Sequence, residues 1–171
     1  MSIGRKLLTG LLVSLGFMAA GAELRTGMQA PAIEAFDQHG TLVKLANFQG
    51  KSNVVLYFYP KDDTPGCTAE ACSLRDGYAA IQATGAVVLG VSADDTLSHQ
   101  AFADKWHLNF SILADPERKV IEAYGVKSLL MLGRASRVTF IIDRQGVIRD
   151  VVDKVDTARH DQQVLALLKQ L

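Results

Sequence analysis

The segment Asn53-Val-Val-Leu-Tyr-Phe-Tyr59 runs directly into Pro60-Lys-Asp-Asp-Thr-Pro-Gly-Cys-Thr-Ala-Glu-Ala-Cys72. Its first part is a continuous apolar run rich in β-branched and aromatic residues, which is typical of a strand buried on both faces of a sheet. In sheets of parallel strands joined by helices, functional groups gather at the carboxyl ends of the strands. The change to polar and turn-forming residues after Tyr59 therefore marks the place where a functional site is expected.

The sequence on either side of this segment alternates between expected strands and helices. Two similar pieces, Asp37-Gln-His-Gly40 and Asp143-Arg-Gln-Gly146, lie between apolar runs and indicate hairpin turns. Periodicity predicts further strands at 86–92, 110–114, 138–142 and 147–152, and helices at 67–83, 97–108, 117–124 and 157–171, the last with Val164, Leu165, Leu168 and Leu171 on its apolar face. This order of elements predicts an α/β sandwich around a central mixed sheet.

Cys67 is expected in the first turn of the helix that follows the buried strand. Thr64 suits the N-cap, and Pro65 suits the first helical position, where the missing N–H of proline costs nothing. The free N–H groups and the positive dipole end of a helix start favour thiolate over thiol. The sequence therefore predicts a nucleophilic Cys67. The alternative is a small buried apolar side chain on the same face as Ala71 and Leu74.

Cys67 and Cys72 are the two cysteines of the chain. In an oxidising compartment such a pair ordinarily forms one disulfide. A bond between residues only five apart closes a very small loop, which constrains the unfolded chain comparatively little. The spacing therefore favours a reactive pair. A structural disulfide in a secreted domain without enzymatic activity is the alternative.

The first 22 residues have the pattern of a secretory signal peptide. Arg5 and Lys6 precede an apolar stretch at 7–18, and Ala20-Gly-Ala22 fits a cleavage site. The apolar stretch is shorter than the roughly 20 residues of a spanning helix, although an uncleaved anchor is the alternative. We expect cleavage near Ala22, export to the periplasm, no stable membrane association, and a single domain over residues 23–171.

The charge of the expected mature domain excludes some partner classes. Loss of Arg5 and Lys6 from the 18 basic residues leaves 16 against 18 acidic residues, a net charge of −2. Basic clusters interleaved with aromatic residues are missing from the sequence, which argues against a nucleic-acid partner. No metal site is expected either, because none of the four histidines lies at ligand spacing from a cysteine: His39, His99, His107 and His160.

Residues 57–76 closely resemble the peroxiredoxins, and within them the bacterioferritin comigratory protein or peroxiredoxin Q branch. The family pattern Pro-x-x-x-Thr/Ser-x-x-Cys is matched by Pro60, Thr64 and Cys67, and a second cysteine five residues later, here Cys72, is typical of the branch. The similarity continues to the end of the chain and covers roughly residues 24–171. The resemblance implies a thioredoxin-like, peroxiredoxin-type α/β sandwich.

The resemblance also implies roles for the two cysteines and for Thr64. Cys67 would be the peroxidatic cysteine, which attacks a hydroperoxide and becomes a sulfenic acid. Cys72 would resolve that acid as an intramolecular disulfide. Thr64 and the N–H groups of the helix start would donate to the peroxide oxygens as negative charge develops on them, although Thr64 could also be a helix cap alone.

A guanidinium is the remaining donor that the resemblance implies. The family pattern assigns it to Arg137, which could otherwise be an exposed cation at a strand end. The residues alone could not choose it over three other arginines: Arg75, Arg134 and Arg149. Glu70 could orient Arg137, or it could be an exposed acid of the first helical turn. Pro60 and Pro65 would support the site.

The expected activity is the reduction of hydrogen peroxide and organic hydroperoxides without a cofactor, by a monomer that a thioredoxin-like protein recharges. An exported thiol–disulfide oxidoreductase of the same fold is the competing enzyme. Those enzymes usually carry Cys-x-x-Cys, whereas four residues separate Cys67 from Cys72.

Overall fold

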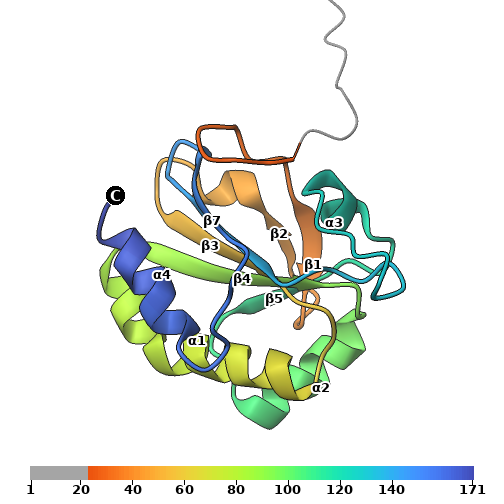
Figure 1. Cartoon of the computed structure of the whole chain (residues 1–171). Coiled ribbons are helices and arrows are strands. Elements are labelled where there is room, and N and C mark those ends of the chain that lie inside the picture. The colour runs from red at the N-terminus through yellow and green to blue at the C-terminus, as the bar shows by residue number, and fades with distance from the viewer. Residues whose placement is uncertain (1–22) are drawn as a thin grey trace, which may run out of the picture.

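The computed structural model describes residues 23–171, which form one twisted mixed sheet with helices on both of its sides (Figure 1). The elements in chain order are β1 (Glu34–Asp37), β2 (Leu42–Lys44), the 3-10 helix η1 (Leu45–Phe48), β3 (Asn53–Phe58), α1 (Pro65–Ala83), β4 (Ala86–Ser92), α2 (Thr96–Trp106), β5 (Ser111–Ala114), α3 (Lys119–Ala123), β6 (Val138–Ile142), β7 (Ile148–Val152) and α4 (His160–Leu168). The strand order is β2-β1-β5-β4-β3-β6-β7.

The centre of the sheet is parallel and its two edges are antiparallel. β3, β4 and β5 are parallel neighbours, connected through α1 and α2, because a parallel pair needs a crossover between its strands. β6 pairs antiparallel with β3 on the other side, and β7 and β2–β1 complete the two edges. The predicted α/β sandwich around a mixed sheet and both predicted hairpins are confirmed.

Two hydrophobic cores lie on opposite faces of the sheet. Every residue of β3 is buried, and its side chains alternate between the faces. Val55 and Tyr57 pack with α1, α2 and α4 on one face, whereas Leu56 and Phe58 pack with η1 and α3 on the other. Figure 1 shows the same division, with η1 and α3 across the sheet from the three longer helices. The carboxyl end of β3 therefore opens onto the start of α1.

The last helix is shorter than the periodicity predicts. The prediction placed it at 157–171, but α4 runs from His160 to Leu168. Asp156 holds the preceding residues in a turn, because its carboxylate accepts hydrogen bonds from the N–H of Ala158 and from the Arg159 side chain. Leu171 is 53% exposed, so its predicted place on the apolar face is wrong.

The predicted signal peptide, residues 1–22, lies outside the described residues. Within residues 23–171, no helix combines the length and the apolar character needed to cross a membrane.

Candidate active site

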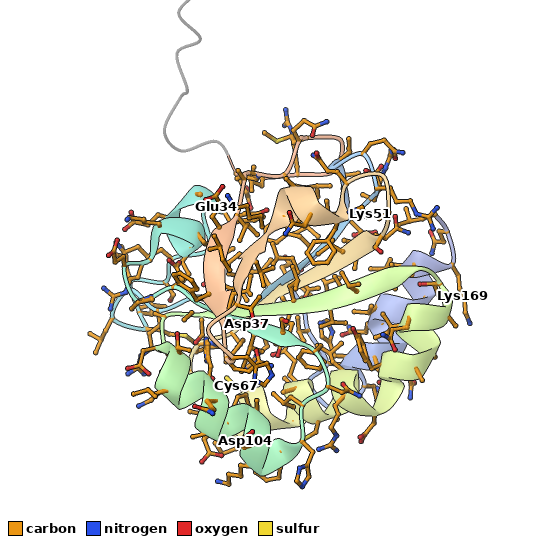
Figure 2. All side chains as sticks on the ribbon, turned by 180° about the vertical axis from the view of Figure 1, so that it is seen from behind. Glu34, Asp37, Lys51, Cys67, Asp104 and Lys169 are labelled. Atoms are coloured by element: carbon orange, nitrogen blue, oxygen red, sulfur yellow. The ribbon has the colours of Figure 1, made fainter. Side chains whose placement is uncertain are left out.

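Cys67 lies in the first turn of α1, where the sequence places it. The helix begins at Pro65 with Thr64 as the N-cap, so Cys67 is its third residue. Its side chain, labelled in Figure 2, is only 1% exposed. It packs in the core with Tyr59 and Ala71. Burial alone would fit the small apolar residue that was the alternative reading, but the neighbouring guanidinium does not.

Arg137 brings its guanidinium to the sulfur of Cys67. Val138 pairs with Phe58 in the antiparallel register of β6 and β3, which puts Arg137 beside the end of β3. Its Nη2 lies 3.4 Å from Cys67 Sγ, and its Nη1 donates to Glu70 Oε2. A methyl group on Gly66 would lie 3.2 Å from Nη2, so glycine at this position gives the guanidinium room.

The other three arginines are placed elsewhere. Arg75 donates to the carbonyl of Trp106, Arg149 pairs with Asp143, and Arg134 lies exposed in the loop before β6. Strand register therefore selects Arg137 from the four arginines that the residues alone left open. Burial would lower the pKa of the Arg137 guanidinium, but Glu70 and Cys67 hold it above its ordinary value, so the side chain is a permanent cation.

Glu70 is fully buried, so the expectation of an exposed first-turn acid is wrong. It lies one turn after Cys67 and pairs with Arg137, as the other reading proposed. Burial raises the pKa of its carboxyl to about 7, although the charge of Arg137 opposes that shift. The charge of this carboxyl therefore changes within the physiological pH range.

Thr64 occupies the N-cap position, but its side chain makes no capping hydrogen bond. Its hydroxyl instead donates to the carbonyl oxygen of Lys61 at 3.0 Å. The first N–H groups of a helix have no partner within the helix, which leaves those of Gly66 and Cys67 directed at the site. Pro60 lies two residues after the end of β3, and Pro65 occupies the first helical position, as predicted.

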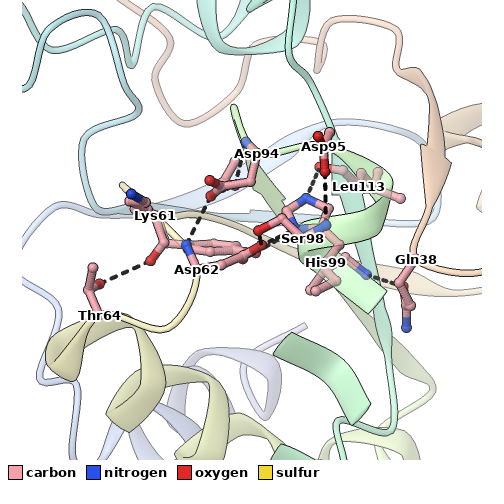
Figure 3. Close-up of polar contacts among 12 residues, drawn as sticks. Gln38, Lys61, Asp62, Thr64, Asp94, Asp95, Ser98, His99 and Leu113 are labelled. Carbon is pink, nitrogen blue, oxygen red and sulfur yellow. Dashed lines mark hydrogen bonds and ion pairs between the residues drawn. The ribbon is translucent and has the colours of Figure 1, made fainter. Parts of the chain in front are cut away.

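Asp62 anchors the loop between β3 and α1, and the sequence did not predict this role. Its buried carboxylate accepts hydrogen bonds from Tyr59 Oη at 2.7 Å, Ser98 Oγ at 2.7 Å and His99 Nδ1 at 2.8 Å (Figure 3). His99 Nε2 faces the carbonyl oxygen of Leu113 at 3.1 Å. Both ring nitrogens of His99 thus face oxygen atoms of the protein. This network ties the loop before Cys67 to α2 and β5.

Cys72 is half-buried and, like Cys67, is a free thiol in this structure. Both cysteines lie on α1, which runs without a break from Pro65 to Ala83. On a regular helix, five residues rise about 7.5 Å and turn the second side chain roughly 140° from the first, so the two Cα atoms lie about 9 Å apart. A disulfide rarely tolerates more than about 7 Å. The pair therefore lies close in the chain but out of bonding reach.

Among residues 23–171, no three His, Cys, Asp or Glu side chains are grouped to hold a metal ion. His99 and His160, which the sequence left scattered, are both buried and hydrogen-bonded to protein partners.

Comparisons with known proteins agree with this geometry. The sequence profile described as the AhpC/TSA family matches residues 26–151. The chain belongs to that family. It is 41% identical to the chloroplastic peroxiredoxin Q of Suaeda salsa over 88% of this chain and 70% of the relative. It is also 41% identical to the bcp peroxiredoxin of Coxiella burnetii, over 85% of this chain and 99% of the relative.

Solved structures show the same fold. The peroxidoxin BcpB of Mycobacterium tuberculosis superposes with a TM-score of 0.81 at 33% identity, over 86% of this chain and 98% of that chain. The bacterioferritin comigratory protein of Xanthomonas campestris, described as having alkyl peroxide reduction activity, gives a TM-score of 0.75 at 31% identity over 81% and 90%. This peroxiredoxin is thus a thiol peroxidase of the peroxiredoxin Q and bcp branch. The likenesses do not favour the thiol–disulfide oxidoreductase or the inert secreted domain.

Proposed function

We propose that Cys67 is the peroxidatic cysteine and Cys72 the resolving cysteine of this peroxidase. The observation that carries the proposal is the contact between Arg137 Nη2 and Cys67 Sγ at 3.4 Å. A fixed cation beside a sulfur at a helix start favours the thiolate, which is the nucleophilic form. An inert buried cysteine would not need this neighbour.

In the first step the Cys67 thiolate attacks the outer oxygen of a hydroperoxide. The S–O bond forms as the O–O bond breaks, which leaves a sulfenic acid and releases an alkoxide or hydroxide that takes up a proton. Arg137 and the N–H groups of Gly66 and Cys67 stabilise the charge that spreads over the two oxygens. The hydroxyl of Thr64 already donates to Lys61, so it accepts the O–H of the substrate and orients it.

In the second step the Cys72 thiol attacks the sulfenic sulfur of Cys67. The S–S bond forms, the S–O bond breaks and water leaves, so the first thiol is regenerated only when an external dithiol reduces the disulfide. A thioredoxin-like protein would supply that dithiol by exchange through a mixed disulfide. Hydrogen peroxide and organic hydroperoxides are the proposed substrates, because the related Xanthomonas enzyme is described with alkyl peroxide reduction.

We also propose that the chain is exported and works as a monomer in the periplasm. The support is the pattern of Arg5, Lys6, the apolar stretch at 7–18 and Ala20-Gly-Ala22. Mass spectrometry of the protein from its native host should find it beginning near Glu23. Intact residues 1–22 would contradict cleavage, and a dimer in light scattering of the purified protein would contradict the monomer.

The cysteine roles are tested by single-turnover kinetics, in which the protein is reduced with dithiothreitol, freed of it and then mixed with hydrogen peroxide. Cys67→Ser should abolish the reaction, because a serine hydroxyl is essentially undissociated near neutral pH. Cys72→Ser should keep the wild-type rate of the first step and then accumulate sulfenic and sulfinic acid. Equal loss of the first step in both variants would reverse this assignment. Insulin reduction without peroxide turnover would instead support an oxidoreductase.

A further inference from the structure

A chain of buried polar groups continues behind Arg137, on the side away from Cys67. Glu70 uses Oε2 to bind Arg137, while its Oε1 is buried and has no hydrogen-bond partner among the described residues. His160 of α4 brings its Nε2 to 3.7 Å from Oε1. Both side chains are completely buried. The missing hydrogen bond therefore cannot come from bulk solvent.

The contacts of His160 fix which ring nitrogen carries its hydrogen. Gln163 accepts the N–H of Asp156 with Oε1 and donates from Nε2 to the carbonyl of Lys154, so the orientation of its amide is set. His160 Nδ1 lies 3.0 Å from the same Oε1 and must donate to it. The hydroxyl of Thr139 lies 2.8 Å from Nε2. A neutral His160 thus turns the lone pair of Nε2 towards Thr139 and Glu70.

Without an added proton, two hydrogen-bond acceptors, one on Glu70 and one on His160, lie next to each other. Glu70 Oε1 and His160 Nε2 then face one another with no hydrogen between them; the hydroxyl of Thr139 can satisfy Nε2, but Oε1 is left as a buried, unpaired acceptor, which is costly. A proton on either atom makes the contact attractive. A second proton would place an imidazolium beside a neutral acid and the cation Arg137, which is unfavourable. The geometry therefore provides a place for one proton.

We propose that Glu70 and His160 form a buried one-proton site behind Arg137, and that His160 is a positioning residue for peroxide reduction that acts through Glu70. The inference rests on the proposed role of Arg137. α4 packs closely against α1 at Gly77, where a methyl group would lie 2.4 Å from Asp161 Cβ. His160 is the next residue to that contact. Its ring is therefore fixed by the packing of the two helices.

The proton would set the charge that Arg137 presents to the reacting oxygens. When the site holds it, the unit of Arg137, Glu70 and His160 has a net charge of +1. When the proton leaves, the Glu70 carboxylate cancels the guanidinium, and less positive charge is available for the transition state. The raised pKa of Glu70 and the lowered pKa of His160, both caused mainly by burial, agree with a site that titrates near neutral pH.

The other titratable groups around the pair do not replace this proton. Tyr57 faces Glu70 from β3, and burial holds the pKa of its hydroxyl so high that it stays neutral. On the side of α4, Asp161 accepts a hydrogen bond from Ser73, and Asp156 pairs with Arg159. Cys67 lies across Arg137 and is measured directly in the test.

The proton itself can be observed without any turnover. Infrared spectra detect a protonated carboxyl, and ¹⁵N chemical shifts detect an imidazolium. At about pH 6 we expect one of the two groups, not both, to be protonated, and the signal to disappear above neutral pH. The Glu70→Gln protein should lack it. Two protonated groups, or none, at that pH would overturn the one-proton site.

The effect on the reaction is measured as the rate constant per thiolate, from stopped-flow kinetics and thiolate absorbance in the same samples. In the wild type it should fall about three- to tenfold as the site loses its proton. Glu70→Gln should remove that fall, because a neutral amide mimics the protonated acid. His160→Gln should move it to lower pH, because the new amide donates permanently to Glu70 Oε1. Exposed His39→Gln is the matched control and should behave as the wild type.

The positioning role of His160 would be overturned if the rate constant per thiolate of the wild type did not change with pH, or if it fell equally in Glu70→Gln. This holds even if the spectra detect the proton. If instead Arg137 itself has no role in the reaction, the result is different: Arg137→Lys would leave the rate constant per thiolate unchanged. If His160→Gln does not fold, the comparison of the wild type with Glu70→Gln still decides the question.

Discussion

Arg137 shares one guanidinium between a carboxylate and a sulfur. Nη1 is held by Glu70, which is completely buried, and Nη2 reaches Cys67 Sγ. A planar fork with several donors can make both contacts at once, whereas an ammonium group acts as a single point charge. Glu70 thus fixes the direction in which Arg137 presents its second N–H group. This division of the fork accounts for a buried acid next to the nucleophile.

Replacement of Arg137 by lysine should slow the reaction with hydrogen peroxide by about one to three orders of magnitude, because the donor beside the sulfur is lost. Stopped-flow measurement of the second-order rate constant checks this. The exposed Arg134→Lys is the matched control and should react at the wild-type rate. An unchanged rate in the Arg137 variant together with a slow Arg134 variant would move the role to Arg134.

Gly66→Ala should lower the activity of the protein without lowering its stability. The backbone of Gly66 is helical, so alanine fits there and favours the helix by up to about 1 kcal/mol. Its methyl group, however, would lie 3.2 Å from Arg137 Nη2 and push the guanidinium away from its place. We expect a rate constant reduced by about three- to tenfold, with equal or higher thermal stability. A fully active variant would show that the guanidinium tolerates the displacement.

At the scale of elements, the two steps of the reaction require two different conformations of the first turns of α1. It has to be folded at its first turn to place Cys67 beside Arg137, yet Cys72 cannot reach Cys67 while the same turns are helical. The cap position of α1 makes no side-chain hydrogen bond, and apart from the Glu70–Arg137 pair the first turns make their contacts through small residues such as Ala71. Local opening of a helix end of this kind is far less costly than global unfolding.

The disulfide form should therefore have unwound first turns of α1. Amide hydrogen exchange should show residues 66–75 losing protection on oxidation, while β3 keeps its protection. The Cys72→Ser protein treated with one equivalent of peroxide serves as the control, because it cannot form the bond. Equal protection of 66–75 in both redox states of the wild type would contradict the idea, since the reduced helix has no break between Cys67 and Cys72.

The loop before α1 is anchored by Asp62, and this anchor should be costly to remove. Asp62→Asn replaces one acceptor oxygen by a donor that faces Ser98 and His99, which also donate. We expect a loss of about 3 kcal/mol in the free energy of unfolding, measured by urea denaturation. Asp63→Asn in the same loop changes only exposed contacts, with Lys105 and Trp106 Nε1, and should cost much less. Similar losses in both variants would mean that the buried network contributes little.

At the scale of the whole molecule, the sequence predicted the parts that depend on neighbouring residues. Continuous apolar runs were enough to predict β3 and β4, and the Thr64–Pro65 start predicted the first turn of α1 with Cys67 in it. The resemblance was needed to choose Arg137, which meets Glu70 across 67 residues of sequence through the β3–β6 register. The His99–Asp62 contact spans 37 residues and depends on how α2 packs. No local pattern could predict such contacts, and the burial of Glu70 was missed for the same reason.

The buried carboxyl of Glu70 should be visible in the stability of the whole protein. Its pKa is about 7 in the folded state against 4.5 as the ordinary value, so the folded protein holds a proton that the unfolded chain releases between these values. Stability from this group is complete below pH 4.5 and is lost as pH rises to about 7. The loss is on the order of 3 kcal/mol.

Glu70→Gln isolates that contribution, because glutamine cannot titrate. The lowered pKa of His160 acts in the opposite sense, costing stability as pH falls below 6.5, and its proton is coupled to that of Glu70, so the difference between the two proteins reports the titration of the pair. Urea denaturation of the two proteins from about pH 4.5 to 8 should therefore show the variant gaining stability relative to the wild type as pH rises. A constant difference would mean that Glu70 is ionised throughout this range, and that Arg137 outweighs the cost of its burial.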